Sequence, residues 1–176
     1  MKRILVVVDM QNDFVDGALG TKEAVGIVEN VVNKIKNFDG KILATLDTHQ
    51  NNYMETAEGR KLPVPHCIRM TYGWLLNEKV LKALDNKEYR IIEKKTFGST
   101  KLVKEIRRLK SDDEIEIEFV GLCTDICVVS NVLLLKAYFP EVKMTVDAGC
   151  CAGVTPESHK SALDTMKMCQ IDVIGE

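Results

Sequence analysis

Short apolar segments alternate with helical segments along this 176-residue chain. Runs rich in Val, Ile and Leu predict strands at 3–8, 41–46, 89–94, 115–120, 142–146 and 171–174. Between them, apolar residues at helical spacing predict helices at 23–37, 74–84, 100–109, 126–138 and 156–168. Parallel strands need such crossover helices, so the pattern predicts a three-layer α/β/α sandwich with a six-stranded, mainly parallel sheet. The length fits a single domain over residues 1–176.

Charge and cysteine content argue against several classes of partner. The 24 Lys and Arg side chains against 26 Asp and Glu give a net charge of −2, which provides no attraction to nucleic acid or to a membrane. The apolar run at 5–8 is too short for a signal peptide and stops at Asp9, and no stretch reaches the length of a membrane span. We therefore expect a cytoplasmic protein whose six cysteines are reduced thiols. Cys123 and Cys127 lack the second cysteine pair that a structural zinc site needs.

The segment 119–136 joins a predicted strand to a predicted helix through a corner that carries a cysteine. Gly121 ends the strand, and Thr124 or Asp125 can cap the helix. Cys127 then lies in the first helical turn, where free N–H groups and the positive end of the helix dipole lower a thiol pKa. Two interpretations stay open for this residue: a catalytic nucleophile, or a small core side chain.

Polar and charged side chains follow several of the predicted strands. Asp9, Asp47, Lys94 and Cys127 all fall at carboxyl ends. Open α/β sheets bind ligands at that edge, so the fold can gather the four residues there. Read one at a time, an acid in this place can also be a loop cap, and Lys94 with Lys95 can be a solvated pair.

Residues 50–71 show no periodicity, and a long irregular stretch in a compact domain is usually functional. Asp47 and His49 lie two apart in an extended segment and can face the same side. With His66 and one further donor, they would form a mixed nitrogen and oxygen site for a divalent ion. The alternative is that all of them are hydrogen-bonded loop residues.

Five segments form an ordered set along the chain. They are Val-Val-Asp-Met-Gln-Asn-Asp-Phe at 7–14, Asp-Thr-His at 47–49, Pro-His-Cys at 65–67, Lys94 shortly before Phe97, and Gly-Leu-Cys-Thr-Asp-Ile-Cys-Val at 121–128. This set resembles the isochorismatase-like cysteine hydrolases and, within them, the nicotinamidases. The resemblance spans the whole chain, and its most specific part is Gly-x-x-Thr-Asp-x-Cys-Val. It implies one isochorismatase-like hydrolase domain over residues 1–176.

The resemblance implies a catalytic triad. Asp9, Lys94 and Cys127 match the family's general base, cation and nucleophile. Lys95 competes with Lys94, but the family's lysine lies three residues before an aromatic residue, which is Phe97 here and selects Lys94.

An oxyanion hole and a substrate wall follow from the same resemblance. The Leu122–Cys123 peptide matches the family's cis bond, and the backbone N–H groups of Cys123 and Cys127 would form the oxyanion hole. Phe14 matches an aromatic residue that packs on the substrate ring, and Phe97 and Leu122 are expected beside it.

A metal site is also implied. Asp47, His49 and His66 match three metal ligands of nicotinamidases, and we expect Glu58 as the fourth, with Glu55 or water as the alternative. The His and carboxylate donors imply one divalent ion, zinc first, with iron and manganese also compatible. No organic cofactor is expected.

The implied activity is hydrolysis of nicotinamide to nicotinate and ammonia through a thioester on Cys127, a reaction of pyridine nucleotide salvage. One alternative is a related cysteine hydrolase that acts on another carboxamide, ureido or carbamoyl compound. Another is a non-catalytic α/β binding module. We expect a small-molecule carboxamide as the partner and, by analogy with relatives, a homo-oligomer.

Overall fold

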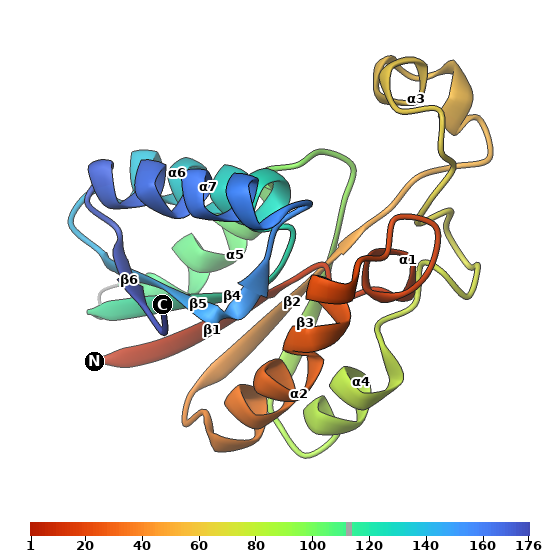
Figure 1. The fold of residues 1–176 in the computed structure, drawn as a ribbon. Coiled ribbons are helices and arrows are strands. Elements are labelled where there is room, and N and C mark those ends of the chain that lie inside the picture. Colours follow the sequence, from red (N-terminus) through yellow and green to blue (C-terminus); the bar gives the residue numbers. More distant parts are fainter. Residues whose placement is uncertain (112–113) are drawn as a thin grey trace.

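A six-stranded parallel sheet forms the centre of the protein (Figure 1). The computed structural model describes residues 1–111 and 114–176. Within them the strands lie in the order β3-β2-β1-β4-β5-β6, and every neighbouring pair is parallel. Their bounds are β1 (Lys2–Val8), β2 (Lys41–Asp47), β3 (Tyr89–Lys94), β4 (Ile115–Leu122), β5 (Lys143–Ala152) and β6 (Asp172–Ile174). The predicted sandwich is confirmed, with a sheet that is wholly rather than mainly parallel.

Helices cover both faces of the sheet (Figure 1). One face carries α2 (Lys22–Asn37) and α4 (Glu78–Leu84), and the other carries α5 (Thr100–Lys110), α6 (Val129–Tyr138) and α7 (Pro156–Met168). The shorter elements are α1 (Asn12–Val15), η1 (Tyr53–Glu55), α3 (Ala57–Lys61) and the π-helical turn η2 (Thr124–Val128). Figure 1 shows α3 standing apart from the sheet, on the excursion between β2 and α4. No helix in the described ranges has the length and apolar character needed to cross a bilayer.

Strand β1 shows why the strand sequences are apolar without alternation. Ile4, Val6 and Val8 pack in the core beneath α5, α6 and α7, whereas Leu5 and Val7 pack in the core beneath α2 and α4. All five side chains are at most 1% exposed. A strand covered on both faces favours such a continuous run, and each fully buried aliphatic side chain contributes about 1.5–3 kcal/mol.

Tertiary pairing explains two predicted boundaries that are wrong. The helix predicted at 74–84 begins only at Glu78, because Leu76 pairs with Gln11 in an isolated antiparallel bridge. The strand predicted at 142–146 continues to Ala152, because its pairing with β4 resumes beyond a register shift.

Candidate active site

Chemically active side chains meet at one edge of the sheet, as predicted. Asp9 follows β1, and Asp47 ends β2. Lys94 ends β3, and Cys127 follows β4 in the turn η2. These four strands are neighbours in the order β3-β2-β1-β4, so their carboxyl ends lie side by side. Open α/β sheets bind their ligands at this edge.

Lys94 is the centre of a buried ion cluster. Its Nζ lies 2.7 Å from Asp9 Oδ2 and 3.2 Å from Asp47 Oδ1. The same nitrogen lies 3.3 Å from Cys127 Sγ, to which it donates. Asp9 is 0% exposed and Lys94 only 2%. The predicted triad therefore forms one contact network, and Lys95, the competing lysine, is exposed outside it.

The Asp9 carboxylate is arranged to accept a proton. Thr45 Oγ1 donates to Asp9 Oδ1 over 2.6 Å. Asp9 Oδ2 forms the ion pair with Lys94 but, among the described residues, is buried without a hydrogen bond. Burial is the main reason that the pKa of the Asp9 carboxyl is raised. The Lys94 charge lowers this pKa, and the nearby Asp47 carboxylate raises it. A raised pKa makes this carboxylate a stronger base.

The Cys127 thiol is a weaker acid than the sequence predicted. Burial raises the pKa of Cys127 well above its ordinary value, the Asp9 carboxylate raises it further, and Lys94 offsets them only in part. The predicted lowering of this pKa is wrong, because burial and the neighbouring Asp9 carboxylate, which residue spacing does not reveal, both raise it. For Lys94, burial favours the neutral amine, but Asp9, then Cys127 and Asp47, outweigh it and raise the pKa of the ammonium. The resting site therefore holds a neutral thiol beside a charged pair, and a base is needed to form the thiolate.

The corner before Cys127 is a π-helical turn rather than the start of the α-helix predicted at 126. The Leu122–Cys123 peptide is cis, as the resemblance implied. The Cys123 carbonyl accepts hydrogen bonds from the N–H groups of Ile126 and Val128, over 3.1 and 3.0 Å. An oxyanion hole built from the N–H groups of Cys123 and Cys127 stays a prediction.

Thr124 and Asp125 do not cap the following helix, so that prediction is wrong. Thr124 Oγ1 instead lies 2.7 Å from Nδ1 of His159 on α7. The Asp125 carboxylate accepts the N–H of Val154 over 3.1 and 3.2 Å. Both side chains therefore connect the turn η2 to residues that follow β5.

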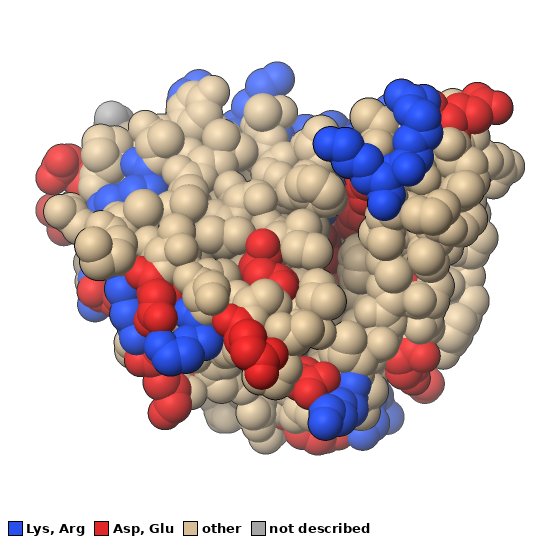
Figure 2. Space-filling model, turned by 45° about the horizontal axis from the view of Figure 1, so that its top comes forward, with Lys and Arg blue, Asp and Glu red and all other residues tan. Residues whose placement is uncertain are grey.

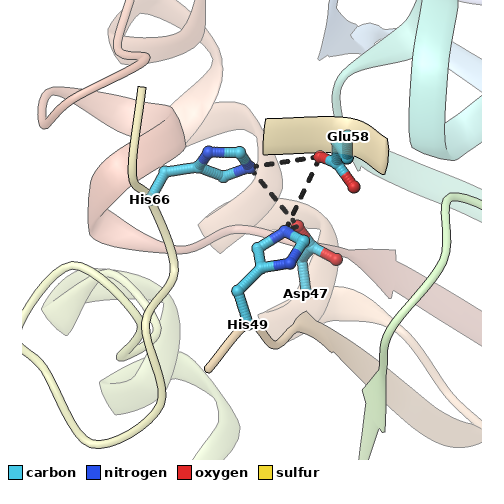
Figure 3. A group of neighbouring side chains, drawn as sticks. All are labelled: Asp47, His49, Glu58 and His66. Atoms are coloured by element: carbon cyan, nitrogen blue, oxygen red, sulfur yellow. Dashed lines mark hydrogen bonds and ion pairs between the residues drawn. The ribbon is translucent and has the colours of Figure 1, made fainter. Parts of the chain in front are cut away.

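A second group of side chains converges around Asp47 (Figure 3), whose carboxylate also contacts Lys94. The metal cluster consists of Asp47, His49, Glu58 and His66, whose ligand atoms all lie within 4.8 Å of one another. His49 Nε2 lies 3.0 Å from Asp47 Oδ2 and 3.7 Å from Glu58 Oε1. His66 Nε2 lies 3.7 and 3.6 Å from the same two oxygens. Glu58 reaches the group from α3, whereas Glu55, the alternative donor, is exposed outside it.

The donor set of the metal cluster fits a divalent ion. A tetrahedral site with bonds of about 2.1 Å places its ligand atoms about 3.4 Å apart. The four distances between an imidazole nitrogen and a carboxylate oxygen, 3.0 to 3.7 Å, are close to this value. His66 Nδ1 lies 2.8 Å from the Val64 carbonyl, which only accepts hydrogen bonds. Nδ1 therefore carries the proton, and Nε2 keeps its lone pair for a metal. Two imidazoles with two carboxylates suit zinc, iron or manganese.

Two residues that the sequence reasoning missed support the metal cluster. Tyr53 is 1% exposed and packs edge-on against both imidazoles, with ring centroids 4.7 Å from His49 and 5.0 Å from His66. Gln11 holds the backbone of Asp47: its Nε2 donates to the Asp47 carbonyl over 2.8 Å, and its Oε1 accepts the Asp47 N–H over 2.7 Å. Tyr53 lies in a stretch without periodicity and Gln11 in a polar loop, so only tertiary contacts reveal their roles.

A cavity of about 450 Å³ lies between Cys127 of the triad and the metal cluster. Its walls include Cys127, Asp47, Glu58, His66, Phe14 and Phe97. The space-filling view, in which the top of Figure 1 is turned forward, shows a hollow with acidic atoms inside it and basic side chains along its rim (Figure 2). Two cavities of about 480 Å³ lie elsewhere, around Arg3 and Glu118, and no triad or metal-cluster residue lines them.

Leu122 is the one predicted substrate contact whose side chain lies outside this cavity. It is 0% exposed and packs with Val120 in the core beneath α2 and α4. The prediction that the Leu122 side chain contacts the substrate is therefore corrected. Successive side chains along β4 point to opposite faces of the sheet, and Leu122 points into the core rather than toward the cavity.

Comparisons with known proteins agree with this geometry. Residues 3–175 match the family model described as Isochorismatase domain. The chain belongs to the isochorismatase family. An uncharacterized isochorismatase family protein, PncA, of Bacillus subtilis (strain 168) is 32% identical over 177 residues, with 93% of each chain covered.

Solved structures share the fold of this isochorismatase-family chain. A nicotinamidase/pyrazinamidase PncA from Bacillus subtilis has a TM-score of 0.84 at 27% identity, over 98% of this chain and 99% of its own. A pyrazinamidase of Pyrococcus horikoshii, solved in complex with zinc, has a TM-score of 0.77 at 25% identity over 100% of both chains. The likeness therefore extends over the whole sandwich and includes the segment between β2 and α4.

Proposed function

We propose that this isochorismatase-family protein is an amidohydrolase that converts nicotinamide to nicotinate and ammonia. The observation that carries the proposal is the contact of Lys94 Nζ with both Asp9 and Cys127, beside a cavity that Cys127 lines together with residues of the metal cluster. Relatives named nicotinamidase or pyrazinamidase, at 25–27% identity over nearly the whole chain, support this class of substrate.

Acylation begins with a proton transfer inside the triad. Asp9 Oδ2 takes the thiol proton of Cys127, and the Lys94 ammonium stabilises the thiolate from 3.3 Å away. The sulfur attacks the amide carbon and forms a C–S bond, and the N–H groups of Cys123 and Cys127 stabilise the oxyanion by about 3–4 kcal/mol each. Asp9 then gives its proton to the amide nitrogen, the C–N bond breaks, and ammonia leaves a thioester on Cys127.

Deacylation repeats these transfers with water. Asp9 takes a proton from a water molecule, whose oxygen attacks the thioester carbon. The C–S bond breaks, the Cys127 thiolate regains its proton from Asp9, and the nicotinic acid that forms loses its proton to solvent to give nicotinate. A base in this position contributes about 10²–10⁴-fold to the rate.

The metal cluster would hold one divalent ion next to the reacting amide. We propose zinc, in line with the zinc complex of the Pyrococcus horikoshii relative, and the same donors also fit iron and manganese. Bound there, the ion would supply a Lewis-acidic contact that orients a heteroatom of the substrate ring. Phe14, whose ring centroid lies 5.5 Å from that of His66, and Phe97 would flank this ring.

Ammonia release from nicotinamide tests the proposal. Metal-loaded wild-type protein should release ammonia and nicotinate in equal amounts, and Cys127→Ala should release none while it keeps the fold. Cys169→Ala removes an exposed cysteine and is the matched control, which should keep full activity. No ammonia from the fully metal-loaded wild type would refute the substrate. Activity of the metal-free protein on a ureido or carbamoyl compound would favour the alternative hydrolase.

We also propose that residues 1–176 act as one hydrolase domain on a small-molecule carboxamide. The homo-oligomer and the cytoplasmic location expected from the sequence stay predictions. Analytical ultracentrifugation of the purified protein checks the first: a single species with the mass of one chain would contradict it.

A further inference from the structure

Asn131 is a fully buried polar residue in a mostly apolar helix. It lies on α6, four residues after Cys127, and its side chain is 0% exposed. Burial of an amide is unfavourable unless hydrogen bonds replace those it made to water. The bonds that Asn131 makes therefore show what it holds in place.

The Asn131 side chain connects two segments that are distant in the sequence. Its Nδ2 donates to the carbonyl of Cys127 over 2.8 Å and to the carbonyl of Phe97 over 3.0 Å. Its Oδ1 accepts the N–H of Ser99 over 2.9 Å. Carbonyls only accept and a backbone N–H only donates, so the reverse orientation of the amide would mismatch all three partners.

The two connected segments carry different parts of the active site. Cys127 supplies the nucleophile, and its turn leads directly into α6. The segment 95–99 starts after Lys94 and contributes Phe97 to the cavity wall. A Cβ added at Gly98 would lie 3.2 Å from the carbonyl of Ser130, so this segment packs closely on α6. Asn131 therefore links the backbone of the nucleophile to the backbone of the cavity wall.

We propose that Asn131 is a positioning residue that fixes the Cys127 nucleophile relative to the wall of the substrate cavity formed by Lys95, Thr96 and Phe97. It acts through the backbone of Cys127 and of Phe97, and the inference rests on the proposed amidohydrolase function. Misplacement of a reacting atom by about 1 Å lowers a rate by about 100-fold. Loss of these bonds should therefore affect turnover beyond its effect on stability.

A merely structural role leads to a different expectation. If Asn131 only satisfies polar groups in the core, its replacement lowers the melting temperature, and the kinetic constants of the folded fraction stay unchanged. Val132→Ala provides the matched control, because it removes a 0% exposed core side chain from the same helix. It should lower the melting temperature without a change in KM.

Two replacements separate the links that Asn131 makes. A threonine hydroxyl can still donate to the carbonyl four residues earlier, that of Cys127, but it has no second donor for Phe97. For Asn131→Thr we expect a KM for nicotinamide raised by about fivefold or more, with kcat within about threefold of wild type. For Asn131→Ala, which loses all three bonds, kcat should fall by about 10- to 100-fold. If the alanine variant does not fold, the threonine variant carries the test alone.

Alkylation by iodoacetamide at one fixed pH gives a readout that needs no substrate. Asn131→Ala should change the rate constant at Cys127 by about threefold or more, while the exposed Cys169 in the same sample reacts as before. Kinetic constants and alkylation rates that match those of Val132→Ala, at an equal loss of melting temperature, would overturn the proposal. If the wild type releases no ammonia from nicotinamide, the proposed function fails, and the alkylation comparison still decides the role of Asn131.

Discussion

Asp9→Asn separates charge from shape in the triad. The amide is nearly isosteric with the carboxylate, and its Oδ1 can still accept the hydrogen bond from Thr45 Oγ1, which is 2.6 Å long in the wild type. The substitution removes the charged oxygen that lies 2.7 Å from Lys94 Nζ, and with it the proposed base for the thiol proton. Lys94 keeps its ion pair with Asp47 at 3.2 Å.

The effect of Asp9→Asn on rate should be large. A general base contributes about 10²–10⁴-fold, so we expect kcat to fall by at least about 100-fold, equal to about 2.7 kcal/mol of activation free energy. The nucleophile should react differently. Because the Asp9 carboxylate helps to raise the pKa of Cys127, its removal should lower that pKa and speed alkylation of the thiol. Turnover and thiol reactivity are thus expected to change in opposite directions.

The effect on stability should be moderate. At an effective dielectric constant of about 20, charges 2.7 Å apart attract by about 6 kcal/mol, most of which offsets their desolvation. Because Asn at position 9 leaves Lys94 paired with Asp47, the free energy of unfolding should fall by about 1–3 kcal/mol. Lys94→Met leaves the buried Asp9 carboxylate without its cation, so it should destabilise by about 3–5 kcal/mol.

Three measurements on each variant test this reasoning. Ammonia release gives kcat, urea unfolding gives the free energy of unfolding, and mass spectrometry after iodoacetamide treatment gives the alkylation rate at Cys127. Wild-type turnover in Asp9→Asn would refute the role of Asp9 as the base. The same role would be refuted if Asp9→Asn slowed alkylation of Cys127 by the same factor as it lowers turnover. A Lys94→Met variant as stable as Asp9→Asn would contradict the electrostatic account of the ion cluster.

The other predictions concern the metal, the pH profile and the thiol. His66→Ala should lower the amount of metal retained after dialysis, and Glu58→Gln should lower it less. Glu55→Gln changes an exposed residue and is the control, which should retain as much metal as the wild type. Equal metal content in all three variants, measured by elemental analysis, would contradict the metal cluster. As the pH drops through the raised pKa of Asp9, kcat/KM should fall, because the protonated carboxyl cannot accept the thiol proton. A decline of kcat/KM only at or below pH 4, about the ordinary pKa of an Asp side chain, would contradict this. Alkylation of wild-type Cys127 at neutral pH should be slow, because burial raises its pKa, and rapid labelling would show that the thiol is already ionised.

The convergence of the triad was predictable from the sequence. Runs that are apolar at every position indicate strands buried on both faces, and such strands are parallel. Parallel neighbours place their carboxyl ends at one edge, so the positions of Asp9, Lys94 and Cys127 at or just after the ends of predicted strands were enough to bring them together.

Properties that depend on the surroundings of a side chain were not predictable. The pKa of Cys127 is set by burial and by its distance from Asp9, and residue spacing shows neither. Asn131 bonds to Phe97, 34 positions away. Glu58 enters the metal cluster from α3, a five-residue helix inside a stretch without periodicity, so only the resemblance pointed to it.

The central claim is that Cys127 carries the acyl group during turnover. Acid quenching of the metal-loaded wild type while it hydrolyses nicotinamide, followed by proteolysis and mass spectrometry, tests this claim directly. We predict a nicotinoyl group on the peptide that contains Cys127, removable by hydroxylamine as a thioester should be. A nicotinoyl group on another residue, or sustained turnover with the Cys127 peptide always unmodified, would contradict it.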